Sequence, residues 1–501
     1  MKKGLVVSLL VLTLMWATNL PTRSQVVPSE SSSKKISENK NLLQLSLNDC
    51  LDISLKNNHR RPASRYALQI SEDQHKQALS AYWPQLSLRA IFSQFDQYPN
   101  FVFPARNIPV PGQTVTLPAN SFGPGLPPGP VPLTSPATQF AVPTQNVKLM
   151  DSSNLLTSLN LTYPLYTGGL RRAKVKQAEK GIEVAKQEVR RTDLQVIYDV
   201  KRMYYGAVLA RKVYQIGKDS LDRLETTLRL TEDLYKRGSG KVKKTDYLRS
   251  KATVEGARAM VVELANNEKL AKAGLINTLG LGWQTSIELT EQEVPYSPLK
   301  ADLDKLVHSS YQFNPDWAKF KAGLEAAELK IKEEQSGHLP KVAITGSLNH
   351  IDNPYNQGIV TAQNKDFMSM GVALEIPIFS GFLTQYKIRE ARANLEKIKE
   401  ERVLLEEGMA LQVKDAFLRL LRAQEQQKAA RAAMLAATEN RELNERAYRD
   451  ELVETKDVLE AQVMESALEA QYQKILYDHN EALAQLNLII GAEVSQIISS
   501  D

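Results

Sequence analysis

Carboxylate and imidazole side chains are the groups that acid–base catalysis and metal binding use most often, and this chain has both. Asp457 and Glu460 are three positions apart in a segment of helical periodicity, so both carboxylates project from one face of a helix. On a single helix, such a pair is an ordinary solvated face. The histidines are scattered, and no pair of them has ligand spacing with a third donor nearby. They are His59, His75, His308, His338, His350 and His479.

The methionine and cysteine residues likewise give no strong sign of copper binding or disulfide formation. Met368 and Met370 flank one residue, which would suit copper, but their neighbours alternate between apolar and small residues, as in a strand with an apolar face. Cys50 is the single cysteine, so no internal disulfide is available, and we expect a small buried helix residue. No phosphate-binding glycine loop, nucleophile elbow or catalytic triad is present. The sequence therefore predicts a protein that is not an enzyme and has no cofactor or metal.

Composition and the N-terminus indicate an exported protein. The 501 residues are enough for roughly two to four ordinary domains, and 43% of them are apolar, as in folded proteins. One uninterrupted apolar run, LVVSLLVLTLMWA, follows Lys2 and Lys3 and precedes small and polar residues. This pattern predicts a secretory signal peptide over 1–24, with cleavage after Ser24. The formal net charge of the whole chain is +6, and without that segment the numbers of positive and negative charges are nearly equal. This near-neutral charge and the export of the protein both argue against a nucleic-acid partner.

The chain repeats itself. Residues 164–168 (PLYTG) and 377–381 (PIFSG) share one pattern, 213 positions apart. At this offset the apolar positions that follow also agree, with spacings of three and four residues, as on the packed face of an amphipathic helix. The offset shifts to 211 beyond the segment 235–246, where the first copy carries two extra residues. The sequence therefore predicts two copies of one structural unit.

Each predicted unit has a short helix, two strands around a loop, a long helix and a return helix. The first unit is expected over 46–281 and the second over 302–491, with a connector at 282–301 and a C-terminal tail at 492–501. At 1.5 Å per residue, a helix of nearly 70 residues spans about 100 Å, which no globular core can bury. The expected elements are 46–82, 84–97, 153–165, 168–236 and 246–279, then 302–337, 341–351, 367–378, 382–449 and 457–490.

The predicted strands have the two-residue period of a wall with two different faces. Leu159, Leu161 and Tyr163, for example, alternate with Asn160 and Thr162. Four strands cannot close a barrel, and an open apolar sheet would aggregate through its edges in water. In a bilayer, open edges are not tolerated at all. The strands therefore belong either to a soluble sandwich or to a closed barrel built by several chains.

Two segments lack the periodicity of packed elements. Residues 98–150 hold twelve of the 23 prolines, including the run FGPGLPPGPVP, which predicts a long external loop without a helix or a core of its own. Residues 25–45, with their serines and charges, are typical of a flexible leader.

The duplicated strand exits and helical tips resemble those of the TolC-like outer membrane efflux proteins (outer membrane factors). The tips read YKRGSGKVKKTDYLRSKA (235–252) and YRDELVETKDVLEAQ (448–462), and the resemblance covers about 45–491. It implies a mixed α/β membrane protein: a homotrimer whose twelve-stranded β-barrel in the outer membrane continues as a long α-helical barrel across the periplasm. It also implies the exit duct of a tripartite efflux pump or type I secretion system. Its partners would be a periplasmic adaptor (membrane fusion) protein, an inner-membrane transporter and outer membrane lipid.

The resemblance assigns adaptor docking to the tips. In the family, a tyrosine is followed by a glycine and, six residues after the glycine, by an aspartate. In the first tip, Gly238 keeps the spacing from the tyrosine and Gly240 keeps the spacing to Asp246. In the second tip, Tyr448 is present, but Glu451 occupies the glycine position, which puts the usual adaptor contact there in doubt. Ordinary turn and helix-start roles explain Gly238, Gly240 and Asp246 equally well.

The resemblance also assigns a periplasmic gate to Asp457 and Glu460. In a trimer, the pair becomes six carboxylates around a narrowing, which would attract cations. The basic residue that the family pattern expects near the tip is replaced by Val453. Lys241 and its basic neighbours on the other tip are candidates for the missing charge.

Aromatic residues gather where strands meet helices, as they do at membrane–water interfaces. The candidates are Trp83, Tyr163, Tyr166 and Phe379. Simple packing at the junctions is the alternative for each residue. For the whole chain, the alternative is a periplasmic coiled-coil structural or adaptor protein without a pore, which would explain the helices but not four alternating strands.

Overall fold

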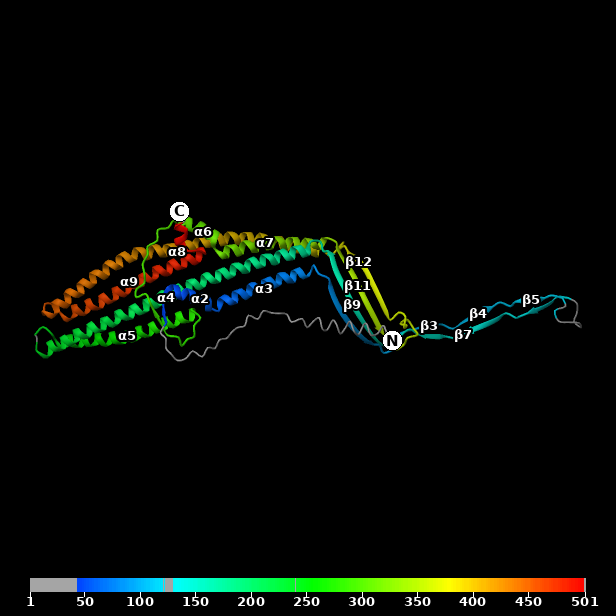
Figure 1. Ribbon diagram of the computed structural model, residues 1–501, viewed down its shortest axis with the longest axis horizontal. Coiled ribbons are helices and arrows are strands. Elements are labelled where there is room, and N and C mark those ends of the chain that lie inside the picture. Colours follow the sequence, from blue (N-terminus) through cyan, green and yellow to red (C-terminus); the bar gives the residue numbers. More distant parts are fainter. Residues whose placement is uncertain (1–42, 120, 122–128, 239, 500–501) are drawn as a thin grey trace.

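The computed structural model describes residues 43–119, 121, 129–238 and 240–499. The expected signal peptide and the leader as far as residue 42 lie outside the described residues. Long helices occupy one end of the molecule, a β-sheet the middle and a two-stranded ribbon the other end (Figure 1). Among the described residues, no helix combines the length and apolar character needed to cross a membrane.

Two long helices form the frame. They are α4 (Leu170–Lys236) and α8 (Leu383–Arg449), both 67 residues long. The offset of 213 relates their ends and also their buried positions, since Val196 and Val200 on α4 correspond to Met409 and Val413 on α8 and all four are buried. The repeat therefore holds in the packing as well as in the sequence.

Shorter helices cover the frame. The return helices α5 (Lys244–Thr278) and α9 (Thr455–Ile490) pack along the half of α4 and α8 that is remote from the sheet. Near the sheet, α4 packs against α3 and α7, and α7 packs against α8; farther away, α4 packs against α5 and α9, and α9 packs against α8. The helices therefore form a curved layer with α8 at one edge and α3 and α5 at the other (Figure 1).

The prediction of one short helix at the start of each unit is wrong. Residues 46–82 form α2 (Leu47–Asn57) and α3 (Arg60–Ser80), and residues 302–337 form α6 (Leu303–Phe313) and α7 (Pro315–Gln335). Asn58 and Asn314 separate them in extended conformation, which the following proline favours at Asn314.

Both asparagines use their side chains in the same way. The Nδ2 of Asn58 donates to the Thr278 carbonyl (2.9 Å), and that of Asn314 donates to the Ile489 carbonyl (2.6 Å). Each acceptor lies at the end of a return helix, whose last carbonyls have no partner within the helix. The break in the first helix therefore caps the end of the return helix of the same unit.

The middle of the helical layer also holds the connector and both ends of the described chain. β1 (Leu43–Leu45) pairs in parallel with β10 (Ile287–Leu289), and Leu45 is buried. Residues 43–45 are therefore part of the fold and not of a flexible leader. The expected tail contains α10 (Val494–Ser499), whose Val494 is buried against α6, α8 and α9. Cys50, on α2, is buried beside β1 as expected.

A four-stranded antiparallel sheet follows the helices, in the order β12-β11-β9-β2. Its strands are β2 (Gln85–Gln94), β9 (Ser153–Tyr166), β11 (Lys341–Asp352) and β12 (Asp366–Glu375). The edge strand β12 leads into α8, and the edge strand β2 follows α3. The β12 edge of the sheet therefore corresponds to the α8 edge of the helical layer, and the β2 edge corresponds to the α3 edge.

Residues 98–150 differ from the predicted irregular loop. They form a ribbon of three successive antiparallel ladders, β3 with β8, β4 with β7 and β5 with β6, which extends away from the sheet (Figure 1). The strands are β3 (Asn100–Phe103), β4 (Arg106–Val110), β5 (Thr114–Leu117), β6 (Val131–Thr134), β7 (Thr138–Val142) and β8 (Gln145–Lys148). The sequence did not predict these strands because prolines lie within them and between them.

Candidate functional site

In its half near the helices, the sheet has one apolar and one polar face, as the alternation predicts. One row across the four strands is Leu88, Leu159, Leu348 and Met368, and the next row toward the helices, on the opposite face, is Ser87, Asn160, Ser347 and Ser369. Met368 and Met370 are 74% and 78% exposed, so the described part of the chain does not cover the apolar face. Both methionines therefore belong to an apolar wall that another phase or molecule must cover.

The strand exits bend in the same way in both repeats. Between the end of β9 at Tyr166 and the start of α4, Gly168 and Gly169 have φ of +64° and +87°. Gly381 and Phe382, which precede α8, have φ of +61° and +64°. Two successive left-handed residues turn each strand into its rod, and a glycine makes this conformation accessible at three of the four positions.

Arg171 fixes the first exit. The pairing of β9 with β11 shifts register between Val342 and Ala343, which leaves Leu165 as an extra residue. The Arg171 guanidinium donates to the carbonyls of Pro164 (2.7 Å) and Leu165 (2.8 Å) and lies 4.5 Å from the centroid of the Tyr82 ring. The first turn of α4 therefore satisfies carbonyls that the irregular strand end leaves without ladder partners.

The predicted interface aromatics surround these exits. Trp83 and Phe379 are 70% and 74% exposed, Tyr166 is exposed, and Tyr163 is half-buried on the apolar face. The Phe379 ring packs edge-on against that of Phe382 (5.4 Å between centroids). Exposed rings at the helical end of an apolar sheet have the location that a membrane belt requires.

The two tips share one backbone turn despite their different residues. Gly238 has φ of +76°, and Glu451, at the matching position, has φ of +55°. At the second tip, the Leu452 amide donates to the Ala447 carbonyl (2.8 Å), which closes the end of α8 in a Schellman-type turn. Gly240 is exposed, and a Cβ at this position would meet nothing within 4 Å.

Hydrogen bonds connect the tips and start the return helices. Lys241 Nζ donates to the backbone carbonyl of Glu451 (2.8 Å), so this lysine links the two tips. The Asp246 carboxylate accepts from the Lys243 amide (2.9 Å), and the Asp457 carboxylate accepts from the Glu454 amide (3.2 Å). Both aspartates therefore stabilise the start of a return helix.

Tyr448 differs from its prediction as a docking residue. Its side chain is 3% exposed, and its hydroxyl lies 2.7 Å from the Thr231 hydroxyl and 3.0 Å from that of Thr455. These residues come from α8, α4 and α9, so Tyr448 joins three helices and does not present its ring to a partner. Its counterpart Tyr235 is 39% exposed and stacks on Tyr247.

A buried polar network above Tyr448 was missed by the sequence reasoning. Gln462, on α9, bonds the Thr227 hydroxyl (3.0 Å) and the Glu445 carboxylate (2.8 Å). Arg441 donates to Glu445 (3.0 Å) and to both carboxylate oxygens of Glu465 (3.1 and 3.2 Å). The i, i+4 spacing of Arg441 and Glu445 is visible in the sequence, but the partners on the other helices are not.

The two predicted gate carboxylates lie on the outside of this bundle. Asp457 and Glu460 are exposed, whereas Val458 and Leu459 between them are buried. Glu460 lies 3.6 Å from Lys456 Nζ on the same helix. Both acids therefore lie on a helix face that the described part of the chain leaves uncovered. Within the described residues, no group of three histidine, cysteine, aspartate or glutamate side chains is placed to hold a metal ion.

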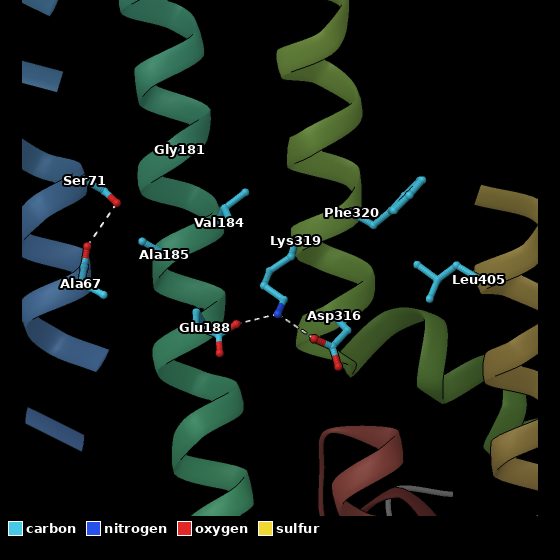
Figure 2. Close-up of a pocket in the computed structure, with 10 residues that line it drawn as sticks. All are labelled: Ala67, Ser71, Gly181, Val184, Ala185, Glu188, Asp316, Lys319, Phe320 and Leu405. Atoms are coloured by element: carbon cyan, nitrogen blue, oxygen red, sulfur yellow. Dashed lines mark hydrogen bonds and ion pairs between the residues drawn. The ribbon is translucent and has the colours of Figure 1, made fainter. Parts of the chain in front are cut away.

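A shallow hollow between α3, α4 and α7 is a packing gap more than a ligand site. Figure 2 shows Lys319 between Glu188 (2.6 Å) and Asp316 (2.8 Å), with Ala185 close by and Gly181 farther along α4. Burial alone would lower the pKa of Lys319, but its bonds with the two carboxylates raise that pKa above the usual value. The charges satisfy one another and leave none for a ligand.

Comparison with known proteins identifies the family. The family model described as outer membrane efflux protein matches residues 138–281 and 306–492, that is, most of both repeats. Protein CyaE of Bordetella pertussis is 26% identical over 247 residues, which are 49% of this chain and 51% of that protein. The alkaline protease secretion protein AprF of Pseudomonas aeruginosa is 24% identical over 258 residues, with the same two shares. The chain thus matches about half the length of these curated relatives.

Solved structures share the fold over nearly the whole chain. A membrane protein from Pseudomonas aeruginosa has a TM-score of 0.68 at 18% identity and covers 89% of this chain and 93% of its own. The outer membrane protein VceC of Vibrio cholerae has a TM-score of 0.66 at 16% identity and covers 89% and 96%. The location is the outer membrane, with the helices in the periplasm. Because the family match extends over both repeats and the fold agrees nearly from end to end, this chain belongs to the outer membrane efflux protein family.

Proposed function

We propose that three copies of this chain close into a trimeric outer membrane channel that conducts its cargo passively from the periplasm to the exterior. One observation carries the proposal: within the described residues, a sheet with an exposed apolar face ends in two edge strands that have no further strand partner, and the helical layer ends at the same two sides. In a bilayer, a sheet is stable only when its edges are paired in a closed barrel. Three sheets of four strands give twelve.

The edges are suited to such a ring. On α8, Leu404, Leu411 and Leu418 follow a seven-residue spacing and are all more than half exposed. On the opposite edge, Met260 and Leu270 of α5 are also exposed. Contact between two different edges repeats from copy to copy and closes when the rotation allows it. Ring closure would cover both helical edges and pair β12 of one copy with β2 of the next.

The channel would serve as the exit duct of a tripartite efflux pump or a type I secretion system. A periplasmic adaptor would dock at the tips around Gly238, Lys241 and Glu451, and an inner-membrane transporter would supply the energy. Among the relatives, AprF is named for alkaline protease secretion and BepC of Brucella suis, 21% identical over 313 residues, is an outer membrane efflux protein. Polypeptides and small molecules are therefore both candidate cargoes.

Fractionation and single-channel recording test the proposal together. We expect a heat-modifiable trimer in the detergent-extracted outer membrane fraction, and stepwise conductance when that trimer is added to a planar bilayer. A periplasmic coiled-coil adaptor would instead be recovered as a soluble protein without conductance. Either a soluble monomer or a membrane trimer that never conducts would contradict the channel.

The acidic tip provides a sharper test. We expect Asp457→Asn with Glu460→Gln to lower the preference of the channel for cations over anions, because a trimer would lose six negative charges at its entrance. Asparagine keeps an oxygen that can accept from the Glu454 amide, so the helix start is disturbed little. Glu396→Gln, at an exposed site on α8 close to the sheet, is the control. Unchanged reversal potentials in the double variant would remove both acids from the entrance.

A further inference from the structure

Both long helices begin with basic residues. The first nine residues of α4 (170–178) hold four cations and no acid, and the first seven of α8 (383–389) hold two cations and no acid. At the far end of α4, residues 228–236 hold two cations and two acids. The excess of cations therefore lies where the long helices meet the sheet (Figure 1). These cations are Arg171, Arg172, Lys174 and Lys176 on α4 and Lys387 and Arg389 on α8.

This charge pattern works against the helices themselves. The start of a helix carries a partial positive charge, so acids stabilise it and cations oppose it. The return helices follow this rule, with Asp246 and Asp457 in their first turns. Neither α4 nor α8 has an acid in its first turn. A local rule that is broken at matching places in both repeats indicates a contact outside the helices.

Contacts within the described chain explain only part of the set. Arg171 is held at the strand exit, whereas Arg172, Lys176 and Arg392 are exposed and form no ion pair with a described residue. Arg172 and Lys176 are four residues apart on one face of α4, and Arg389 and Arg392 are three apart on one face of α8. The offset of 213 relates Lys176 to Arg389. Each repeat therefore presents two exposed cations, called here the basic pairs, at the same place.

The exposed apolar wall continues up to the basic pair of α8. Apolar and aromatic side chains are exposed from the end of β12 into the first turn of the helix: Ile376, Ile378, Phe379, Phe382, Leu383 and Tyr386. The Arg389 guanidinium lies 5.7 Å from the centroid of the Tyr386 ring, where the apolar run ends. Helical side chains lean toward the N-terminus of their helix, so the cations lean back toward this wall. Even Arg392 is only about 14 Å along the axis from Leu383.

We propose that the basic pairs bind the anionic headgroups of phospholipids in the periplasmic leaflet of the outer membrane. The inference rests on the membrane location of the protein and goes beyond the proposed channel, since it requires neither a pore nor a trimer. Clusters of lysine and arginine directly beside a membrane attract anionic lipid, by a factor of about five in affinity for each cation. Headgroup phosphates also supply the negative charge that the starts of α4 and α8 lack.

A soluble acidic protein suits the basic pairs less well than lipid does. The pair on α8 directly follows a wall of exposed apolar and aromatic side chains, which is the sequence of surfaces met on leaving a bilayer. Tyr386 and Arg389 combine both kinds of contact in one turn of helix. The tips, where an adaptor is proposed to dock, lie at the opposite end of the long helices.

Retention of lipid by the purified protein tests the proposal. The protein in mild detergent is incubated with equal amounts of phosphatidylglycerol and phosphatidylcholine and passed over a gel-filtration column, and the retained lipids are quantified by mass spectrometry. We expect the parent to retain more of the anionic lipid. Arg172→Gln with Lys176→Gln and Arg389→Gln with Arg392→Gln should each lose about half of this excess, because the two pairs act at separate places.

A matched control keeps the same change of charge away from the membrane. Lys251→Gln with Lys269→Gln removes two exposed cations of α5, in the half of the helical layer remote from the sheet, and should leave the excess unchanged. The variant that combines all four substitutions of the basic pairs should lose the excess. Equal retention of both lipids by the parent, or an undiminished excess in the combined variant, would overturn the proposal.

Thermal unfolding separates lipid binding from a structural role. In a neutral detergent without lipid, we expect the combined variant to unfold at the same temperature as the parent or a higher one, because the lost cations oppose the helix dipoles. Added phosphatidylglycerol should raise the unfolding temperature of the parent more than that of the variant. A lower unfolding temperature of the variant without lipid would assign the cations to the fold and overturn the proposal. A conducting channel without preference for anionic lipid would reject this inference alone.

Discussion

Glu451 and Phe382 occupy backbone positions that glycine occupies in the other repeat. Their φ values of +55° and +64° correspond to +76° at Gly238 and +87° at Gly169. A side chain in this region costs about 1–2 kcal/mol, so the second repeat carries local strain that the first avoids. The contact of the Phe382 ring with the Phe379 ring offsets part of this backbone cost. Glu451 keeps the turn even though the glycine motif is lost, so the difference between the two tips lies more in their surface chemistry than in their backbone shape.

We predict that Glu451→Gly stabilises the second tip. The released strain exceeds the extra freedom of glycine in the unfolded chain, for a net gain of about 0.5–1 kcal/mol. Limited proteolysis of the purified protein at the tip measures the effect as slower cleavage. Gly238→Ala is the matched control: a Cβ there meets nothing within 4 Å, so its expected loss is due to the backbone alone. Faster cleavage of Glu451→Gly than of the parent would contradict this account.

We predict that the buried His479 makes the folded protein less stable in acid. It is 1% exposed, neither ring nitrogen has a hydrogen-bond partner among the described residues, and burial lowers its pKa below 6.5. As the pH falls through about 6.5, the unfolded chain takes up a proton that the folded chain resists, so stability falls with falling pH. His479→Leu removes the imidazole that causes this difference in proton uptake. Denaturant unfolding of both proteins at pH 7 and 5 should show a smaller acid loss in the variant, and equal losses would exclude His479 as a source.

At the scale of elements, the sequence predicted what periodicity encodes. The long helices and the four strands of the sheet were found because they keep one period over many residues. The breaks at Asn58 and Asn314 were missed because they depend on carbonyls at Thr278 and Ile489, far away in the sequence. The ribbon was missed because proline content outweighed the short alternations around it. At the tips, Asp246 and Asp457 were identified as candidates, but the burial of Tyr448 depends on three helices and was not visible.

The strand exits provide a matched pair of element-level variants. Gly168→Ala and Gly381→Ala impose the same backbone strain, since φ is +64° and +61°. A Cβ at Gly168 would also lie 2.7 Å from Leu339 Cβ and 2.9 Å from the Ser336 carbonyl oxygen, whereas one at Gly381 meets nothing within 4 Å. We expect Gly381→Ala to cost about 1 kcal/mol and Gly168→Ala about 2–4 kcal/mol. The temperature at which the proposed trimer dissociates in SDS would rank the two variants, and equal shifts would show that the contact with 336–339 adds no cost.

At the scale of the whole molecule, α4 is the central rod and both edges are open. α4 packs against α3, α5, α7 and α9, so it is covered along its whole length, whereas α8 is covered on one side. A covered central rod with exposed leucines on the α8 edge is the arrangement that the proposed ring requires. The stability of a single copy and its assembly are therefore separable, since edge substitutions need not disturb the rod.

We predict that Leu411→Glu with Leu418→Glu prevents assembly while each copy still folds. The two side chains are 68% and 52% exposed in the single chain, so the folded copy tolerates the change. In a ring they would be buried at every interface, where loss of each leucine costs about 1.5–3 kcal/mol before the penalty of burying a charge. Gln412→Glu adds a charge at an exposed neighbouring position off the leucine stripe and is the control. Circular dichroism should show unchanged helix content, and gel electrophoresis without heating should show the oligomer for the control and the monomer for the double variant. Persistence of the oligomer in the double variant would mean that α8 does not form the contact between copies.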